Sequence, residues 1–371
     1  MIIQTGERNS AKRANENQPN GGMGISPEDK KQIGMNEKPI YKVCVWCNTY
    51  NQTSYIKDTM DGFCMQQTSF PFACHIMDDA STDGEPEVIK QYLNDHFDTE
   101  WTKETDDYHL TVARHQENKN CYFAVYLLKY NHYSIKKRRL KYYREVTDET
   151  DYVALCDGDD YWTDAHKLQK QADALDANPQ VTLVYTNFQT IDGEGNPISR
   201  PFIKDFPGRS HSGDNLPTLL RYGNYIMVLS CMYRYKVFES EYRTNSPVRM
   251  DFDNTMCAAL MGDFIWLPEQ TGCYRILESG MIQTGRRKGD DWGYDIYRYY
   301  AGLVMKRRCK PQSFRQRMEA TTLILIWALK RKDVQFRKEV LNDRFLAWLV
   351  LPVAYVNVKV ERLKDRLIKK R

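Results

Sequence analysis

Residues Asp151–Trp162 read Asp-Tyr-Val-Ala-Leu-Cys-Asp-Gly-Asp-Asp-Tyr-Trp, an apolar run followed by a group of acids. Its apolar part, Tyr152–Cys156, has the length of a strand that is buried on both faces, which is typical of a parallel sheet between layers of helices. The strand ends abruptly at three acids, Asp157, Asp159 and Asp160. Open α/β sheets bind their ligands at the carboxyl ends of their strands, so we expect these acids to lie at a ligand site.

Three carboxylates within four residues repel one another unless a cation or hydrogen-bond donors compensate them. Mg²⁺ or Mn²⁺ suits such a site, because these ions take one or two protein carboxylates and complete their coordination with water and substrate phosphate. The alternative is an acidic turn in which Asp164 caps the next helix. The sequence around this turn decides between the two.

Apolar runs of strand length alternate with segments of helical periodicity on both sides of this stretch. We expect strands at Tyr41–Cys47, Phe72–Met77, Tyr108–Ala113 and Val181–Asn187, and helices at Ser54–Gln66, Glu85–Phe97, Cys121–Tyr130 and Ala165–Ala177. This alternation predicts an α/β fold with a Rossmann-like, mostly parallel central sheet flanked by helices. The polar loops 48–51, 78–84 and 157–160 would then gather at one edge of the sheet.

The rest of the chain divides by composition. Residues 1–38 are polar and predict a disordered tail. Residues 39–290 would form the main domain, with a donor half at 39–190 and an acceptor half at 191–290 that contains a helix at Leu216–Tyr222 and a strand at Phe264–Leu267. Residues 291–371 predict a helical C-terminal extension with a basic amphipathic end.

Composition limits the class of partner and the compartment. A formal net charge of +4 is too small to indicate nucleic-acid binding. The N-terminus carries no apolar signal core, and several of the ten cysteines fall inside apolar runs, where a free thiol behaves as a small hydrophobe. We therefore expect a reducing, cytoplasmic compartment.

Four motifs in order carry a family resemblance. Thr49-Tyr50-Asn51-Gln52 follows the first strand, Asp78-Asp79-Ala80-Ser81-Thr82-Asp83-Gly84 follows the second, and Asp157-Gly158-Asp159-Asp160 follows a later one, with Met250-Asp251-Phe252 beyond them. Together they resemble the family 2 glycosyltransferases with a GT-A fold over roughly residues 42–279. The segment Tyr152–Gln171 looks like the branch that builds bacterial cell-surface polysaccharides.

The resemblance implies a role for each matching residue. The donor, a nucleotide-diphosphate sugar with UDP as the expected nucleotide, would contact the following residues: Thr49, Tyr50, Asn51, Asp78, Asp79, Asp157, Asp160 and Arg275. Asp159 would coordinate the Mg²⁺ or Mn²⁺ ion that bridges the diphosphate. Asp251 would be the general base, although Asp253 stands two residues away and the sequence does not separate the two. Ser279-Gly280 would belong to a loop that closes near the donor phosphates.

The resulting hypothesis is an inverting, metal-dependent glycosyltransferase that acts on a hydroxyl of a growing surface glycan or a lipid-linked acceptor. One base and direct in-line attack give inversion, since no second carboxylate has to act as a nucleophile. One alternative is a nucleotidyltransferase. Enzymes of that class carry a Gly-rich phosphate loop after the first strand, and this chain has Asn48–Gln52 there, which disfavours the alternative. The other alternative is a non-catalytic module that binds nucleotide sugars at a membrane surface.

The sequence allows more than one role for each of three further segments. Where the family has an Arg-Asn pair near the donor, we expect Arg114 or Lys119 to make the contact. Lys136–Arg139 reads as a solvated loop or as a site for phosphates. Glu361–Arg371 is strongly basic with one apolar side. This pattern suits an interfacial helix on anionic lipid at the inner face of the plasma membrane, or else a helix used for packing or for a homo-oligomer.

Overall fold

The computed structural model describes residues 40–137, 139–147, 150–199, 209–246, 250–277, 292–306, 308–343 and 345–368. Residues Pro39–Arg371 form one compact unit, which is the unit considered below. The expected disordered tail at 1–38 lies outside the described residues.

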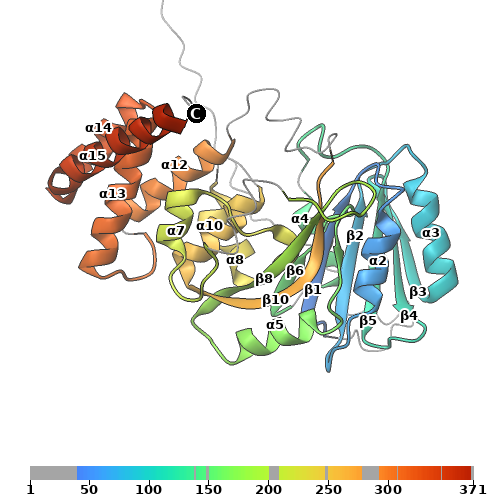
Figure 1. Ribbon diagram of the computed structural model, residues 1–371. Helices are drawn as coiled ribbons and strands as arrows, with labels where there is room; N and C mark the ends of the chain where they lie inside the picture. Colours follow the sequence, from blue (N-terminus) through green and yellow to red (C-terminus); the bar gives the residue numbers. More distant parts are fainter. Residues whose placement is uncertain are drawn as a thin grey trace, which may run out of the picture. The chain divides into compact units, whose positions relative to one another are not determined.

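A ten-stranded sheet runs through the described part of this unit (Figure 1). In spatial order its strands are β3 (Phe97–Glu104), β4 (Tyr108–His115), β5 (Cys121–Leu128), β2 (Phe72–Asp78), β1 (Val43–Thr49), β6 (Tyr152–Leu155), β9 (Cys231–Arg234), β8 (Val181–Ile191), β10 (Asp263–Arg275) and β7 (Tyr161–Trp162). The four central strands β5, β2, β1 and β6 are parallel, and so is the pair β8–β10. The remaining pairings are antiparallel, so the parallel centre has antiparallel additions on both sides.

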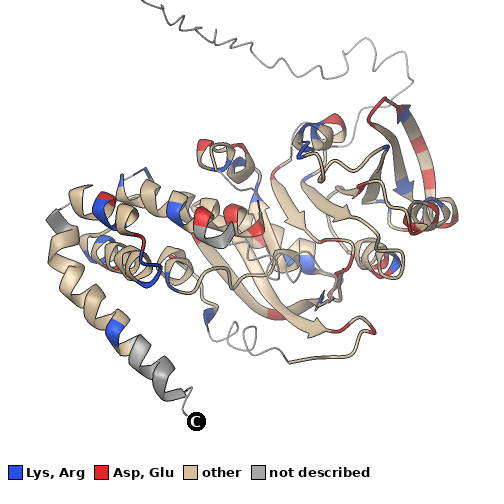
Figure 2. Ribbon diagram, turned by 90° about the horizontal axis from the view of Figure 1, so that it is seen from above, with Lys and Arg blue, Asp and Glu red and all other residues tan. Residues whose placement is uncertain are grey.

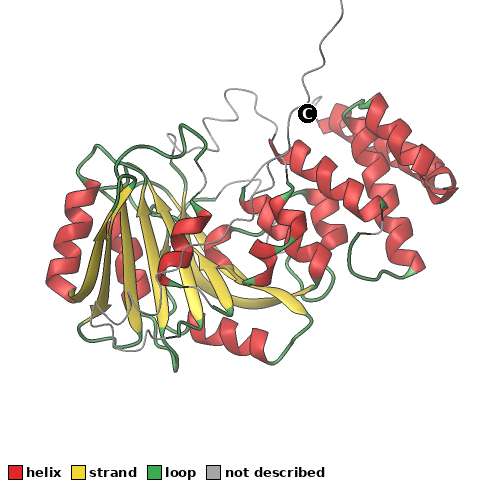
Figure 3. Cartoon of the chain, turned by 180° about the vertical axis from the view of Figure 1, so that it is seen from behind, coloured by secondary structure: helices red, strands yellow, loops and turns green. Residues whose placement is uncertain are grey.

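Helices cover both faces of the sheet (Figure 3). One buried cluster joins one face to α2 (Ile56–Cys64), α3 (Glu85–His96) and α5 (Lys167–Asp176). A second cluster joins the other face to α4 (Leu140–Val146), α7 (Leu216–Tyr222), α8 (Lys236–Glu239) and α10 (Asp251–Met261). Because side chains alternate along a strand, β1 supplies Cys44 and Trp46 to one cluster and Val43 and Val45 to the other. The expected α/β class is thus confirmed.

One predicted element is wrong in type. A helix is expected at Cys121–Tyr130, but residues Cys121–Leu128 form the strand β5, which is buried on both faces. A short, continuous apolar run has no periodicity that separates a buried strand from a buried helix. The edge strand β3, which directly follows α3, was also not predicted.

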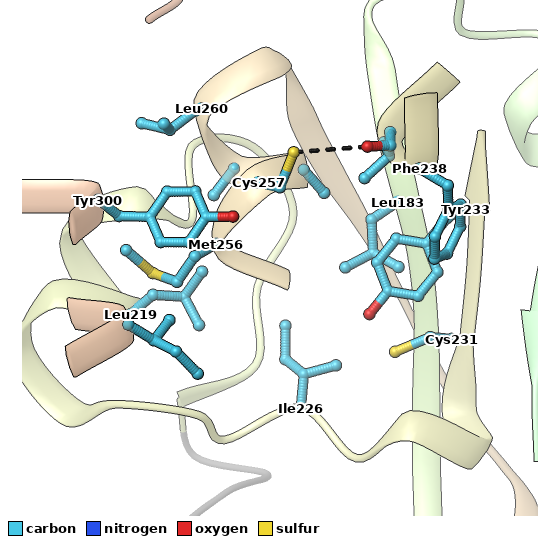
Figure 4. Close-up of a cluster of buried hydrophobic side chains, with 14 of the residues drawn as sticks. Leu183, Leu219, Ile226, Cys231, Tyr233, Phe238, Met256, Cys257, Leu260 and Tyr300 are labelled. Carbon is cyan, nitrogen blue, oxygen red and sulfur yellow. Dashed lines mark hydrogen bonds between the residues drawn. The ribbon is translucent and has the colours of Figure 1, made fainter. Parts of the chain in front are cut away.

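The C-terminal helices share a core with the sheet. These are α12 (Trp292–Met305), α13 (Phe314–Lys330), α14 (Val334–Asp343) and α15 (Phe345–Ile368). Figure 4 shows how Tyr300 of α12 meets Leu219 of α7 and Met256 of α10. The short elements η2 (Val228–Ser230) and α9 (Glu241–Thr244) complete this side. The expected helical extension is therefore present and packs on the main domain. No helix among the described residues is both long and apolar enough to cross a bilayer.

Candidate active site

The parallel strands bring the predicted loops to one edge of the sheet. Thr49 pairs with Asp78 at the ends of β1 and β2, and Asp78 pairs in turn with Leu127 near the end of β5. β6 runs parallel to β1 and ends at Leu155, directly before the acidic turn. The carboxyl ends of all four strands therefore share an edge, as the sequence predicted for three of them.

The loops after β1 and β2 are tied to each other. The Thr49 hydroxyl donates to the buried Glu85 carboxylate, which also accepts from the Gln52 amide at 2.8 Å. Asn51 adopts a left-handed backbone with φ of 55°, and its amide donates to Ser81 Oγ at 2.8 Å. Thr49 and Asn51 thus hold the two loops together, whereas the Tyr50 ring is 46% exposed and remains accessible to a ligand.

Asp78 and Asp79 are both buried but differ in their partners. Asp78 Oδ2 accepts from the Ser81 amide at 3.1 Å, while its Oδ1 is buried without a hydrogen-bond partner among the described residues. Burial raises the pKa of Asp78. Both oxygens of Asp79 are engaged, because they accept from the backbone amides of His132 at 2.7 Å and Tyr133 at 3.0 Å. Of the two carboxylates, Asp78 has the oxygen that is left without a partner among the described residues.

The acidic turn is held close to β1. The Gly158 amide donates to the Asn48 carbonyl at 3.1 Å, and a Cβ added at Gly158 would lie 2.2 Å from Thr49 Oγ1. The Thr59 hydroxyl of α2 donates to the Asp160 carbonyl at 2.7 Å. Only glycine allows this close approach between the turn and the end of β1, so the position of Asp157 and Asp159 depends on it.

We call Asp157, Asp159, Asp160 and Asp251 the acidic cluster, because Asp157 and Asp160 each feel the charge of Asp159 and Asp157 also feels that of Asp251. Burial, followed by the charges of Asp251 and Asp159, raises the pKa of Asp157 to about 8, while Arg139 and a hydrogen bond from Asn48 act in the opposite direction. Burial and the Asp159 charge also raise the pKa of Asp160. Asp251 comes about 90 residues after this turn in the sequence, and the fold brings it within electrostatic range of Asp157.

The two candidates for the base have different environments. Asp253 is completely buried, lies 3.0 Å from Arg243 Nη1 and accepts from the Tyr300 hydroxyl at 2.6 Å. Asp251 begins α10, is exposed, and acts electrostatically on Asp157. Asp253 therefore anchors α10 to its neighbours, and Asp251 is the carboxylate that a substrate can reach.

Arg139 is a site residue that the sequence analysis missed. Its guanidinium lies 3.4 Å from Asp79 Oδ2, and its charge lowers the pKa of Asp157. Within Lys136–Arg139, Arg139 and Lys137 make ion pairs, and Lys137 Nζ lies 2.6 Å from Asp107 Oδ1. Arg138 lies outside the described residues. The place of Arg139 in the sequence could have identified it, because Arg139 follows β5, whose carboxyl end lies at the site edge of the sheet.

The predicted contacts from Arg114 or Lys119 are not supported. Arg114 is the penultimate residue of β4 and Lys119 lies in the connection to β5, so both are at the opposite edge of the sheet from the acidic cluster. Arg114 Nε donates to the Lys119 carbonyl at 2.9 Å, and its guanidinium stacks over Tyr122. The reason is that β5 is a strand parallel to β2 and antiparallel to β4. The connection from β4 to β5 therefore lies at the amino ends of the parallel strands, away from the site.

Arg275 is occupied by protein acceptors. Its amide donates to Asp160 Oδ1 at 2.8 Å, and its guanidinium donates to the carbonyls of Asp159 at 3.0 Å and Gly193 at 3.0 Å and to Asp58 at 3.2 Å. The side chain is only 4% exposed. This geometry favours a role in holding the acidic turn over a direct contact with donor phosphates. The expected closing loop at Ser279-Gly280 lies outside the described residues.

The described residues contain no group of three or more His, Cys, Asp or Glu side chains that could hold a metal ion. A Mg²⁺ or Mn²⁺ ion needs fewer protein ligands than this, because water and substrate phosphate supply the others. The mutual repulsion within the acidic cluster is the feature that such a cation would relieve. The carboxylates of the acidic cluster therefore suit a divalent ion that binds together with a diphosphate.

Comparison with known proteins defines the class. The model of glycosyl transferase family 2 matches residues 44–240, which include β1, β2, β6 and the acidic turn. The chain belongs to this family, and the expectation of a glycosyltransferase is confirmed at the level of the family.

Two curated relatives have similar sequences. The chain is 29% identical over 245 residues to Rv1520 of Mycobacterium tuberculosis (strain H37Rv) and to Mb1547 of Mycobacterium bovis, both uncharacterized proteins. The match covers 65% of this chain and 61% of theirs. The chain thus spans about three fifths of the length of these relatives.

Solved structures show partial likeness. Residues 1–349 of S. aureus TarS, in complex with UDP-GlcNAc, align with a TM-score of 0.46 and 14% identity over 87% of this chain and 92% of that one. The mannosyltransferase PcManGT from Pyrobaculum calidifontis, in complex with GDP-Man and Mn²⁺, aligns with a TM-score of 0.39 and 15% identity over 88% and 92%. The family assignment rests on the sequence match.

Proposed function

We propose that this chain is an inverting, divalent-metal-dependent glycosyltransferase that uses a nucleotide-diphosphate sugar, with a UDP-sugar as the expected donor. The observation that carries the proposal is the acidic cluster, in which Asp251 from the acceptor half acts on Asp157 of the turn after β6. A base on one side and a diphosphate-binding turn on the other are what a single in-line displacement requires.

The donor would bind along the carboxyl edge of the parallel strands. The exposed Tyr50 ring offers a stacking surface for the base, and the unpaired Asp78 Oδ1 offers an acceptor for a base N–H group. Asp159, with Asp157 beside it, would hold the Mg²⁺ or Mn²⁺ ion, which supplies Lewis-acid stabilisation of the diphosphate when bound. Arg139 adds a positive charge at the same edge.

In the proposed reaction the acceptor oxygen attacks the anomeric carbon as the bond from that carbon to the diphosphate oxygen breaks. Asp251 accepts the proton of the acceptor hydroxyl, a contribution of about 10²–10⁴-fold in rate. The configuration at the anomeric carbon inverts, because the sugar is displaced once.

The nature of the acceptor rests on the family resemblance. It implies a hydroxyl of a growing surface glycan or of a lipid-linked sugar, at the cytoplasmic side of the membrane. The alternatives are a nucleotidyltransferase and a non-catalytic nucleotide-sugar-binding module, and their products differ. A transferase releases nucleoside diphosphate, a nucleotidyltransferase releases pyrophosphate, and a binding module releases neither.

A donor-turnover assay tests the proposal. The chain is incubated with UDP-GlcNAc or GDP-mannose and Mn²⁺, with and without EDTA, and the released nucleotide is measured. We expect metal-dependent release of nucleoside diphosphate that falls at least about 100-fold in Asp251→Asn. Calorimetry of the same variant should show donor affinity within a factor of about three, since Asp251 serves the acceptor.

A matched control is Glu87→Gln, which changes an exposed carboxylate in the first turn of α3, away from the acidic cluster. It should behave as the wild type. Asp159→Asn should abolish the metal-dependent part of turnover and leave the melting temperature within a few degrees. Full turnover in Asp159→Asn would refute the metal role, and lost donor affinity in Asp251→Asn would refute the assignment of the base.

A further inference from the structure

The helix α15 has two apolar faces. Its inner face, formed by Ala347, Val350, Ala354 and Val358, is buried against the other C-terminal helices. Its outer face carries large apolar side chains at helical spacing that are between 47% and 60% exposed: Leu349, Val353, Val356 and Val360, with Trp348 and Tyr355 beside them. A helix of a globular protein normally presents polar side chains to water, so the outer face is built to be covered by something.

The outer face is distinctive in its length and in its lack of charge. Figure 2 shows almost no acidic or basic residues along the described side chains of α15. The single basic side chain there, Lys359, lies 5.0 Å from the centre of the Tyr355 ring. Trp and Tyr rings prefer the boundary between lipid headgroups and acyl chains, where one end of the ring is apolar and the other is wet.

The charge of the following residues favours a lipid occupant. Residues 359–371 contain seven basic residues (Lys359, Arg362, Lys364, Arg366, Lys369, Lys370 and Arg371) and two acidic ones (Glu361 and Asp365). An apolar helix face that continues into a basic segment binds anionic membranes through both apolar burial and charge. In a parallel pair of α15 helices the basic segments would lie together and repel, whereas an anionic lipid surface attracts them.

We propose that the outer face of α15 is a docking surface for an anionic lipid bilayer, in which the helix lies along the membrane interface. This assignment differs in place from the basic segment 361–371, since it puts the apolar anchor at Trp348–Val360. It does not depend on the proposed glycosyltransferase activity. An interfacial helix also agrees with the finding that no described helix can cross a bilayer.

Vesicle sedimentation of the full chain tests the proposal. We expect binding to vesicles of phosphatidylcholine with phosphatidylglycerol, and weaker binding to phosphatidylcholine alone. The double variant Val353→Asp/Val356→Asp should lower the affinity for anionic vesicles at least about tenfold. The matched control Val334→Asp alters a valine of α14 that is 50% exposed and does not belong to the outer face, and it should bind as the wild type does.

Two further measurements make the outcome decisive. Anionic vesicles should shift the tryptophan emission of the wild type to the blue, and the shift should shrink in Trp348→Phe, a change that keeps the face apolar. Analytical ultracentrifugation without lipid reports self-association. The proposal is overturned if the wild type does not bind anionic vesicles, if Val353→Asp/Val356→Asp binds them unchanged, or if that variant instead dissociates a dimer of the wild type.

Discussion

Gly158 illustrates how one residue without a side chain sets the geometry of the site. The acidic turn approaches the end of β1 so closely that a Cβ at Gly158 would lie 2.6 Å from Thr49 Cβ. We expect Gly158→Ala to lower the free energy of unfolding by about 1–3 kcal/mol, because overpacking of a tight contact forces the backbone to move. Donor affinity should fall as well, since the displaced turn carries Asp157 and Asp159.

The measurement is urea unfolding together with donor calorimetry. Gly302→Ala is the control, because a Cβ at Gly302 in α12 meets nothing within 4 Å. That change should leave stability unaltered or raise it by about 1 kcal/mol, the difference between Gly and Ala inside a helix. Equal behaviour of the two variants would contradict the proposed contact.

Lys167 is a buried cation outside the candidate active site. It is fully buried, donates to Gln171 Oε1 at 2.7 Å and lies 4.3 Å from the centre of the Trp162 ring. Burial lowers the pKa of Lys167 from 10.5 to about 8. Between these values the unfolded chain binds more protons at this position than the folded chain, so this lysine makes stability rise with pH from about 8 to 10.5.

The prediction concerns the difference in unfolding free energy between the wild type and Lys167→Met. This difference should shift in favour of the wild type by about 1.4 kcal/mol per pH unit at most between pH 8 and 10.5, and should be constant below pH 8. Chemical unfolding across this range measures it. The variant Lys57→Met, at an exposed position of α2, should show no such trend, and a flat difference for Lys167→Met would contradict the prediction.

Among the elements, β10 has a function beyond its place in the sheet, because its last residue, Arg275, clamps the acidic turn. We expect Arg275→Ala to lower the free energy of unfolding by about 2–3 kcal/mol, the scale of hydrogen bonds from a charged and buried donor. Metal-dependent donor binding should weaken in parallel. If the guanidinium instead contacted donor phosphates directly, affinity would fall without a loss of stability.

Urea unfolding and calorimetry separate these outcomes. The control is Arg144→Ala in α4, which removes an exposed ion pair with Glu239 at 3.3 Å. Exposed pairs of this kind contribute about 1 kcal/mol or less. The control should therefore change neither property by a comparable amount.

Some features of the candidate site could be predicted from the sequence, and others depend on how the elements pack. The turn Asp157–Asp160 was placed correctly because an apolar strand and its acids are adjacent in the chain. Arg139 could not be assigned to the site from the sequence, because a helix at Cys121–Tyr130 would not place the segment after it at the carboxyl edge of the sheet, whereas the strand β5 does. The choice between Asp251 and Asp253 required tertiary contacts, since Arg243 and Tyr300 reach Asp253 from other helices.

For the unit as a whole, the packed helices predict how the chain tolerates truncation. Tyr300 of α12 and the apolar side chains of α13 belong to the same buried cluster as Leu219 and Met256. Removal of residues 292–371 would expose this cluster to water. We expect the shortened chain to aggregate or to lose its cooperative unfolding transition.

Circular dichroism in the near ultraviolet and a thermal melt provide the measurement. Removal of residues 1–38, which fall outside the compact unit Pro39–Arg371, serves as the control and should leave the melting temperature unchanged. A soluble chain ending at residue 291 with a sharp melt would show that the sheet domain folds without the C-terminal helices.

The first turn of α10 carries one exposed acid, Asp251, and one buried acid, Asp253. Asp253 is fixed by Tyr300, a residue of α12 beyond the segment 44–240 that matches the family. Asp251, the proposed proton acceptor, also lies outside that segment, and it begins the helix whose Asp253 is held by Tyr300. Under the proposed function, we expect substitutions in α12 to change the turnover rate while every proposed donor-binding motif stays intact, so the presence of the motifs would not by itself predict the catalytic rate of related chains.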